Sequence, residues 1–324
     1  MTAANGPASA GVLPGQARAT ARVAVVGSLN MDLVARVARM PLPGETLAGQ
    51  TFALVPGGKG GNQAVAAARL GAQVSMIGRI GDDSNGAMLR AGLESEGIDC
   101  AALAETPSAP TGVALILVDD DGRNSIVIVA GSNGALTPDD ITRHEAVLAQ
   151  ADVVMCQLET PPATVLAALA AARRLGKTVI LNPAPVTGPL PAQWLPLVDY
   201  LVPNELEAAT LTGLPIGSPR DAVVAAQALV AQGARNVLIT LGSAGVVAAV
   251  GGEEPVHVPA PRVAAVDTTA AGDTFIGAFA AQLAQGASTD AALRFAQRAA
   301  AISVTRAGAQ PSIPTRAELD AAAC

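Results

Sequence analysis

The residues best suited to chemistry lie late in the chain, in the segment D-T-T-A-A-G-D at positions 267–273. This turn of small residues leads into an apolar stretch that we expect to be a helix over 272–285. The first turn of a helix has unpaired N–H groups and a positive dipole end, which can hold phosphate oxygens. Ala271 and Gly272 leave room for a phosphate, and Asp273 could take a proton from a nearby hydroxyl. The alternative is that Asp273 only caps the helix.

A second candidate is the glycine cluster P-G-G-K-G-G-N-Q at positions 56–63, expected between a strand and a helix. It is not a Walker A loop, because the chain contains no Gly-x-x-x-x-Gly-Lys-Ser/Thr pattern. Gly27 does not begin a Rossmann fingerprint either, since Ser-Leu-Asn follows it. Consecutive glycines let backbone approach a small polyhydroxylated ligand, and Lys59 and Asn62 offer donors. The alternative is a turn that binds nothing.

Polar side chains also follow two expected strands. Asn30 and Asp32 come shortly after a β-branched first strand, and Glu159 follows a later one. Because ligands of parallel sheets bind at the carboxyl ends of the strands, these groups could face a common site. Asp32 could accept hydrogen bonds from two sugar hydroxyls. An Asx-type turn for Asp32 and a helix-start role for Glu159 are the alternatives.

The hydrophobic pattern alternates between short β-branched runs and amphipathic segments. This alternation predicts a Rossmann-like, doubly wound α/β fold with a mostly parallel sheet. Two strand pairs, drawn from about 33–55 and 111–130, are broken by turn residues and predict a small separate sheet. Strands are expected at 22–27, 33–39, 46–55, 74–80, 111–118, 125–129, 153–157, 179–182, 200–203, 237–240 and 246–250, and helices at 61–70, 84–96, 162–175, 205–211, 219–232, 272–285 and 290–306.

Composition narrows the class of protein. We expect residues 1–20, rich in Ala, Gly, Pro and Ser, to be a disordered tail, and residues 21–324 to form a single α/β domain. A net charge of −7 and only 2% aromatic residues argue against a nucleic-acid or anionic-membrane partner. No apolar run is long enough to span a bilayer, which predicts a soluble protein. The three cysteines lack metal-ligand spacing, so the expected setting is the reducing cytoplasm.

Taken together, these segments resemble the ribokinase-like (PfkB) carbohydrate kinase family over residues 22–319. The order and spacing of the motifs make chance agreement implausible. The resemblance implies a Rossmann-like body with a small β lid, which closes over the sugar and pairs between subunits in a homodimer. The motifs that carry it are G-S-L-N-M-D (27–32), P-G-E-T (43–46), G-G-K-G-G-N-Q-A-V-A-A-A (57–68), T-G-V-A (111–114), Q-L-E (157–159), L-N-P-A-P (181–185), P-N-E-L-E-A (203–208), T-L-G-S-A-G (240–245), D-T-T-A-A-G-D-T-F (267–275) and V-T-R-A-G-A-Q-P-S (304–312).

The resemblance also implies an activity: transfer of the ATP γ-phosphate to O5 of D-ribose, with Asp273 as general base. Mg²⁺ would be positioned by Glu207 through water, and an activating K⁺ would lie behind the turn at 267–273. The implied anion hole consists of Ala270, Ala271 and Gly272. The implied sugar contacts are Asn30, Asp32, Gly57, Gly58, Lys59, Gly60, Asn62, Glu159 and Asp273. The implied ATP contacts are Asn204, Glu207, Thr240, Gly242, Gly245, Gly272 and Gln297. The implied K⁺ ligands are Asp267, Thr269, Ser303, Arg306, Gly308 and Ser312.

The chain departs from the family pattern at four positions: Gly61 where Ala is common, Thr269 where Ile is frequent, and Ile276 and Gln297 where polar or His residues are common. The departures at Ile276 and Gln297 leave the composition of the adenine pocket undecided by the resemblance. Deoxyribose, another pentose or a nucleoside remains an alternative substrate, because sequence does not show whether Asp32 pairs with a 2-hydroxyl. A sugar-binding regulator without turnover is an alternative of another class. A nicotinamide oxidoreductase would need the missing dinucleotide fingerprint.

Overall fold

The computed structural model describes residues 21–322, so the predicted tail at 1–20 lies outside the described residues. Its main sheet has nine strands in the order β13-β12-β11-β10-β9-β8-β1-β4-β5. Neighbouring strands are parallel except at the β11–β12 and β12–β13 pairs, which are antiparallel. The strands are β1 (Arg22–Val26), β4 (Gln73–Gly81), β5 (Leu103–Thr106), β8 (Val153–Cys156), β9 (Thr178–Leu181), β10 (Tyr200–Leu201), β11 (Asn236–Thr240), β12 (Val246–Ala249) and β13 (Val256–Val258).

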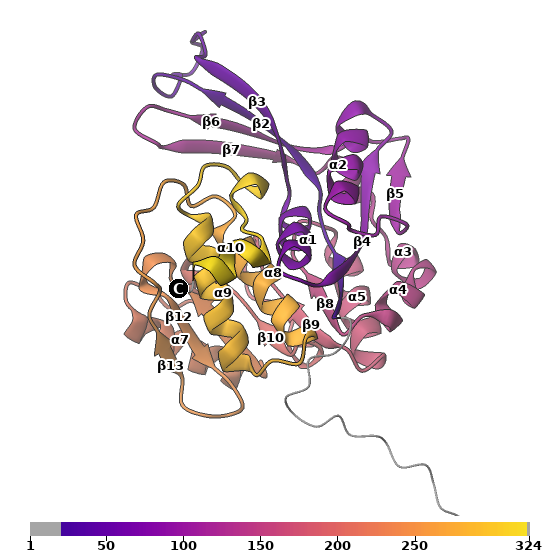
Figure 1. Ribbon diagram of the computed structural model, residues 1–324, viewed down its shortest axis with the longest axis vertical. Helices are drawn as coiled ribbons and strands as arrows, with labels where there is room; N and C mark the ends of the chain where they lie inside the picture. The colour runs from indigo at the N-terminus through magenta and orange to yellow at the C-terminus, as the bar shows by residue number, and fades with distance from the viewer. Residues whose placement is uncertain (1–20, 323–324) are drawn as a thin grey trace, which may run out of the picture.

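Helices cover both faces of this sheet, as Figure 1 shows. Successive residues of a strand point to opposite faces, and β1 follows this rule: Val23 and Val25 pack into one apolar core, Ala24 and Val26 into another. The predicted doubly wound α/β fold is therefore confirmed. The first core includes residues of α1 (Lys59–Arg69), α2 (Ser84–Ser95), α8 (Ala271–Ala284), α9 (Thr289–Ser303) and α10 (Arg316–Ala321), and the second includes residues of α3 (Pro138–Arg143), α4 (Glu145–Gln150), α5 (Pro162–Arg174), α6 (Glu205–Thr212) and α7 (Pro219–Ala231).

A second sheet of four strands projects from one end of the body (Figure 1). We call it the lid sheet; its order is β3 (Thr51–Gly57), β2 (Asn30–Arg36), β6 (Gly112–Val118) and β7 (Asn124–Val129). The outer pairs are antiparallel and the central β2–β6 pair is parallel. The predicted small sheet is confirmed, but β2 begins three residues before the expected start at 33. Asn30 and Asp32 consequently lie within a strand, and the Asx-turn alternative is wrong.

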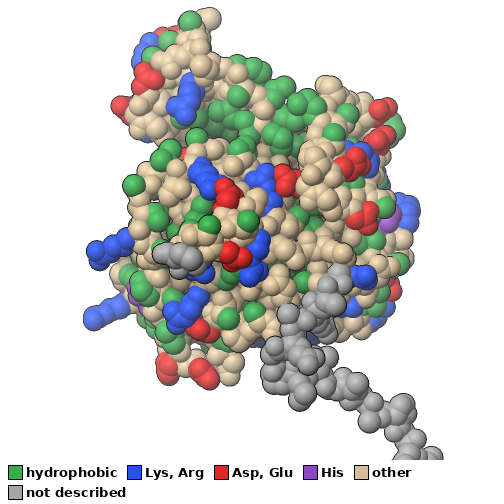
Figure 2. Space-filling view, in the orientation of Figure 1, with side chains coloured by type: hydrophobic (Ala, Val, Ile, Leu, Met, Phe, Trp, Pro, Cys, Tyr) green, Lys and Arg blue, Asp and Glu red, His purple; other side chains and the backbone are tan. Residues whose placement is uncertain are grey.

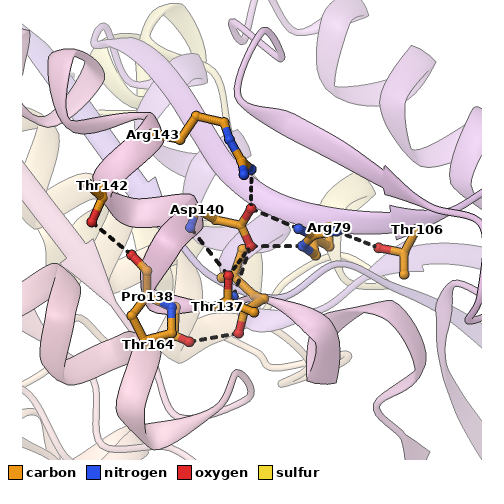
Figure 3. Close-up of polar contacts among 9 residues, drawn as sticks. Arg79, Thr106, Thr137, Pro138, Asp140, Thr142, Arg143 and Thr164 are labelled. Atoms are coloured by element: carbon orange, nitrogen blue, oxygen red, sulfur yellow. Dashed lines mark hydrogen bonds and ion pairs between the residues drawn. The ribbon is translucent and has the colours of Figure 1, made fainter.

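A largely buried ion pair joins strand β4 to helix α3 (Figure 3). Arg79 on β4 donates to both carboxylate oxygens of Asp140 on α3, at 3.0 and 2.8 Å. Ser132, in the 3-10 turn at Gly131–Ala135, donates to the Arg79 carbonyl at 3.1 Å. Arg79 thus contacts α3 through its side chain and the 3-10 turn through its carbonyl. Within residues 21–322, no helix is both long and apolar enough to cross a bilayer.

Candidate active site

Asp273 lies in the first turn of α8, and its side chain does not cap that helix. Only 8% of the residue is exposed. Its Oδ2 accepts from Asn62 Nδ2 and its Oδ1 from Gln63 Nε2, both at 3.0 Å. Burial raises the pKa of Asp273, although Lys59 and these two amides lower it. The capping alternative is therefore wrong, and the carboxylate is instead held by helix α1.

The turn before Asp273 presents unpaired backbone donors. Ala270 caps α8 in the left-handed conformation, with φ of 58°. The amides of Ala271 and Thr274 are bonded to carbonyls of Thr268 and Ala270, at 3.2 and 2.8 Å. Within residues 21–322, the amides of the intervening two residues have no acceptor, and nothing lies within 4 Å of a Cβ built on Gly272. The turn can therefore admit an anion at the Gly272 and Asp273 amides, whereas the Ala271 amide, which was expected to contribute, is already bonded.

Lys59 is surrounded by carboxylates. Burial disfavours its charge, but Asp273, Glu159 and Glu207 together raise its pKa above the ordinary value. Burial also raises the pKa of Asp32 to about 7, with Glu159 and Asp273 adding to the shift. Glu207 has a raised pKa mainly because it is buried. The predicted sugar, base and Mg²⁺ residues thus share one electrostatic site.

The glycine cluster packs backbone against the chain's own first loop. A Cβ on Gly57 would lie 2.3 Å from Asp32 Oδ2, and one on Gly60 would lie 2.6 Å from the Ser28 amide. Gly58 has φ of 84°, which favours glycine. Gly57 ends β3 and α1 begins at Lys59, so Lys59 and Gly60 are helical, and the expected loop is confined to Gly58. The interpretation as an inert turn is not supported, because the glycines make room for candidate site residues.

Two side chains that the sequence analysis did not single out donate hydrogen bonds to residues expected to bind the sugar. Ser28 Oγ donates to Glu159 Oε2 at 2.5 Å, and the Lys59 amide donates to the same oxygen at 3.0 Å. Asn133 Nδ2 donates to Asn30 Oδ1 at 2.8 Å. Both Ser28 and Asn133 are 1% exposed. Ser28 lies within the 27–32 motif, whereas Asn133 stands in the sequence A-G-S-N-G, which carries no signal of this role.

The residues expected to contact ATP lie around the ends of β10 and β11. Asn204 and Glu207 form a capping box: the Asn204 amide donates to Glu207 Oε2 at 2.9 Å, and the Glu207 amide donates to Asn204 Oδ1 at 2.8 Å. Thr240 pairs with Asn204 across the sheet edge. Gly242 and Gly245 follow with φ of 52° and 100°. Elsewhere in this region, Gln297 Nε2 donates to the Val258 carbonyl at 2.9 Å, so its amide nitrogen supports a strand.

Hydrogen bonds join the two segments that carry most of the expected cation residues, 267–269 and 303–308. Asp267 Oδ1 accepts from the Thr269 amide at 2.9 Å and from its hydroxyl at 2.6 Å, and Oδ2 accepts from the Gly308 amide at 2.9 Å. Although burial opposes it, these bonds lower the pKa of Asp267. Ser303 precedes Val304, and Arg306 lies two residues after it; the Val304 carbonyl accepts from the Asp267 amide at 3.1 Å. No group of three His, Cys, Asp or Glu side chains within 21–322 is arranged to hold a metal, so a cation here would need carbonyl ligands.

Comparison with known proteins identifies the family of the chain. The model of the pfkB family of carbohydrate kinases matches residues 20–316. The chain belongs to the pfkB carbohydrate kinase family. The family predicted from the motifs is confirmed, and so is its fold.

Relatives within the pfkB family include kinases of two related sugars. A ribokinase of Haemophilus influenzae is 45% identical over 91% of this chain and 95% of its own length. A deoxyribokinase of Salmonella typhi is 41% identical over 90% of this chain and 95% of its own. The structure of Arabidopsis thaliana ribokinase complexed with ribose and ATP aligns with a TM-score of 0.86 and 34% identity, covering 93% of this chain and 98% of that one.

Proposed function

We propose that this chain is a ribokinase, which transfers the γ-phosphate of ATP to O5 of D-ribose and releases ribose 5-phosphate and ADP. The observation that carries the proposal is the buried carboxylate of Asp273 beside unpaired amides at the start of α8. The similarity to the Haemophilus ribokinase and to the Arabidopsis ribokinase with ribose and ATP supports it. A sugar-binding regulator would not need both features.

In the proposed reaction, Asp273 accepts the O5 proton while O5 forms a bond to the γ-phosphorus. The bond from that phosphorus to the ADP oxygen breaks, and ADP leaves with the electron pair. The amides of Gly272 and Asp273 stabilise charge on the phosphoryl oxygens. Lys59, whose pKa is raised despite its burial, adds positive charge to the same site.

The sugar would be held by the end of β2 and the start of α1. Asn62 Oδ1 is buried and has no partner within residues 21–322, so it can accept a bond from a sugar hydroxyl. Asp32, Asn30 and Glu159 supply further acceptors on neighbouring segments. Gly58 and Lys59 would contribute at the helix start.

The donor sets fit the implied cations. The capping bond uses Glu207 Oε2 and leaves Oε1 for a water of Mg²⁺, which neutralises phosphate charge when bound. A carboxylate has about four lone-pair sites, and Asp267 uses three of them, which leaves one for K⁺. Ser312 Oγ donates to the Ala309 carbonyl at 2.8 Å and keeps its lone pairs. The carbonyls of Thr269, Ser303, Arg306 and Gly308 would complete that site.

The deciding experiment measures ADP release with ribose, deoxyribose, other pentoses and nucleosides, with and without K⁺. We expect ribose to be preferred and K⁺ to increase the rate. Asp273→Asn should lower kcat by about 10²- to 10⁴-fold, because it removes the proton acceptor. Near-normal turnover by that variant would reject Asp273 as the base, and preference for deoxyribose would favour the activity named for the Salmonella relative.

We also propose a homodimer formed through the lid sheet. Every residue of β7 is exposed, including Ile126, Val127 and Ile128 at 52%, 59% and 48%. Figure 2 shows hydrophobic side chains gathered along the lid sheet. An apolar edge strand of this kind favours pairing with another chain.

The free, buried thiols of Cys100 and Cys156 support a reducing cytoplasmic setting.

A further inference from the structure

Behind Asp273, three buried amide side chains form a continuous chain of hydrogen bonds. Gln157 Nε2 donates to Gln63 Oε1 at 2.7 Å. Gln63 Nε2 donates to Asn182 Oδ1 at 3.2 Å and to Asp273 Oδ1 at 3.0 Å. Asn182 Nδ2 donates to the Val202 carbonyl at 3.0 Å. We call Gln157, Gln63 and Asn182 the amide relay; they come from three different segments of the chain.

The orientation of the amide relay is fixed at its Val202 end. A backbone carbonyl can only accept, so Asn182 turns Nδ2 toward Val202 and Oδ1 toward Gln63. Gln63 must then present Nε2 to that oxygen, and the second hydrogen of the same nitrogen points to Asp273. A flipped Gln63 would lose all three of these side-chain bonds and would place an oxygen against the carboxylate.

At the other end of the amide relay, Gln157 uses its donor nitrogen and leaves its acceptor oxygen unpaired. Gln157 Oε1 is buried and has no partner within residues 21–322. Leaving a buried acceptor unpaired costs free energy, which its Nε2 bond to Gln63 must offset. A Cβ on Gly27 would lie 2.1 Å from this oxygen, so only glycine there leaves room for Gln157.

We propose that Gln63 is a positioning residue that holds the Asp273 carboxylate toward the acceptor hydroxyl, and that Gln157 and Asn182 hold Gln63 in turn. The inference rests on the proposed role of Asp273 as the base. Gln63 is 0% exposed, so it acts from behind the carboxylate. Asn62 holds the other carboxylate oxygen, and each oxygen keeps a lone pair for the incoming proton.

Charged groups from other elements also face Asp273: Lys59 on α1, Asp32 on β2, Glu159 after β8 and Glu207 on α6. Substitution of Gln63 or Gln157 leaves all four of these charged groups in place. Because the Gln63 donor stabilises the ionised form, its loss raises the pKa of Asp273 further. The base is then protonated up to a higher pH, and the acidic limb of the kcat profile moves upward.

The test compares kcat against pH at saturating ribose and Mg-ATP for the full chain and three variants. Gln63→Met removes the donor at similar size and should move the acidic limb up by about one to two pH units, with KM for ATP unchanged. Gln157→Met keeps the Gln63 donor but removes the bond that fixes the orientation of Gln63, and should give a smaller shift in the same direction. Gln282→Met is the matched control on α8: within residues 21–322 its side-chain amide bonds only to Gln285, at 2.9 Å, so the variant should leave the acidic limb in place.

An equal fall in kcat at every pH, with an unmoved limb, would give Gln63 a purely structural role and overturn the proposal. If Gln63→Met does not fold, as judged by thermal melting, Gln157→Met decides by the same criterion. A ¹³C NMR titration of the Asp273 carboxyl, assigned by its loss in Asp273→Asn, measures the shift without turnover. A shifted signal in a chain that phosphorylates no sugar would reject the proposed function and leave the positioning role standing.

Discussion

The two carboxylates that matter most to the proposed reaction are held in opposite ways. Asp273 is buried, and each of its oxygens accepts a bond from α1. Asp32, on the lid sheet, is only half-buried, and no side-chain or backbone donor within residues 21–322 bonds to its carboxylate. The comparison teaches that the group that reacts is fixed in advance, whereas the group that recognises keeps its lone pairs for the ligand.

The largest effect is expected from disturbing the contact between α1 and α8, which holds Asp273. A Cβ on Gly277, one turn after Asp273, would lie 2.5 Å from both Ala66 Cβ and the Gln63 carbonyl oxygen. Gly277→Ala should therefore push α1 from α8, cost about 1–3 kcal/mol of unfolding free energy and lower kcat by up to about 10²-fold. Urea unfolding and steady-state kinetics measure both effects.

The same substitution elsewhere provides the control. Gly92 lies in α2, and nothing lies within 4 Å of a Cβ built there. Gly92→Ala should stabilise the protein by about 0.5–1 kcal/mol and leave kcat unchanged. Equal results for the two glycines would contradict the view that helix contact positions the base.

Ribose binding through Asp32 should depend on pH. The pKa of Asp32 is raised to about 7, so the carboxylate is protonated at pH 6 and ionised at pH 8. Ribose affinity should therefore rise by about an order of magnitude between these values, because the ionised form accepts two hydroxyls. Calorimetric titration measures this directly. Asp32→Asn should weaken binding at pH 8 by about 10- to 100-fold and abolish the pH dependence; a dependence that survives would assign it to another group.

The smallest effect on the fold is expected at the outer edge of the lid sheet. Val127→Glu places a charge on the exposed strand β7 and should shift sedimentation from dimer to monomer, since pairing would bury that charge. The free energy of unfolding of the monomer should change by less than about 0.5 kcal/mol. Val224→Glu on α7 is the control, because Val224 is 54% exposed away from the lid sheet. A dimer that survives Val127→Glu would argue against pairing through β7.

Sequence reasoning predicted the parts of the molecule that depend on local pattern. The alternation of apolar runs gave the doubly wound body, and the motif spacing gave Asp273 at a helix start. It missed β5, because Leu103–Thr106 is short and carries no clear alternation. It also missed the amide relay, since Gln63, Gln157 and Asn182 meet only after three distant segments fold together. Capping at Asn204 was likewise overlooked, although the N-E-L-E pattern permits it.

The strand β2 has a thermodynamic consequence beyond its place in the sheet. It carries Asn30 and Asp32 at one end and forms the centre of the lid sheet along the rest of its length. In the proposed function, ordering of this end of β2 by the sugar is coupled to the conformation of the lid sheet, and linkage requires the reverse coupling to have the same free energy. The proposed sugar affinity and the conformational equilibrium of the lid sheet would therefore share one coupling free energy, transmitted along β2.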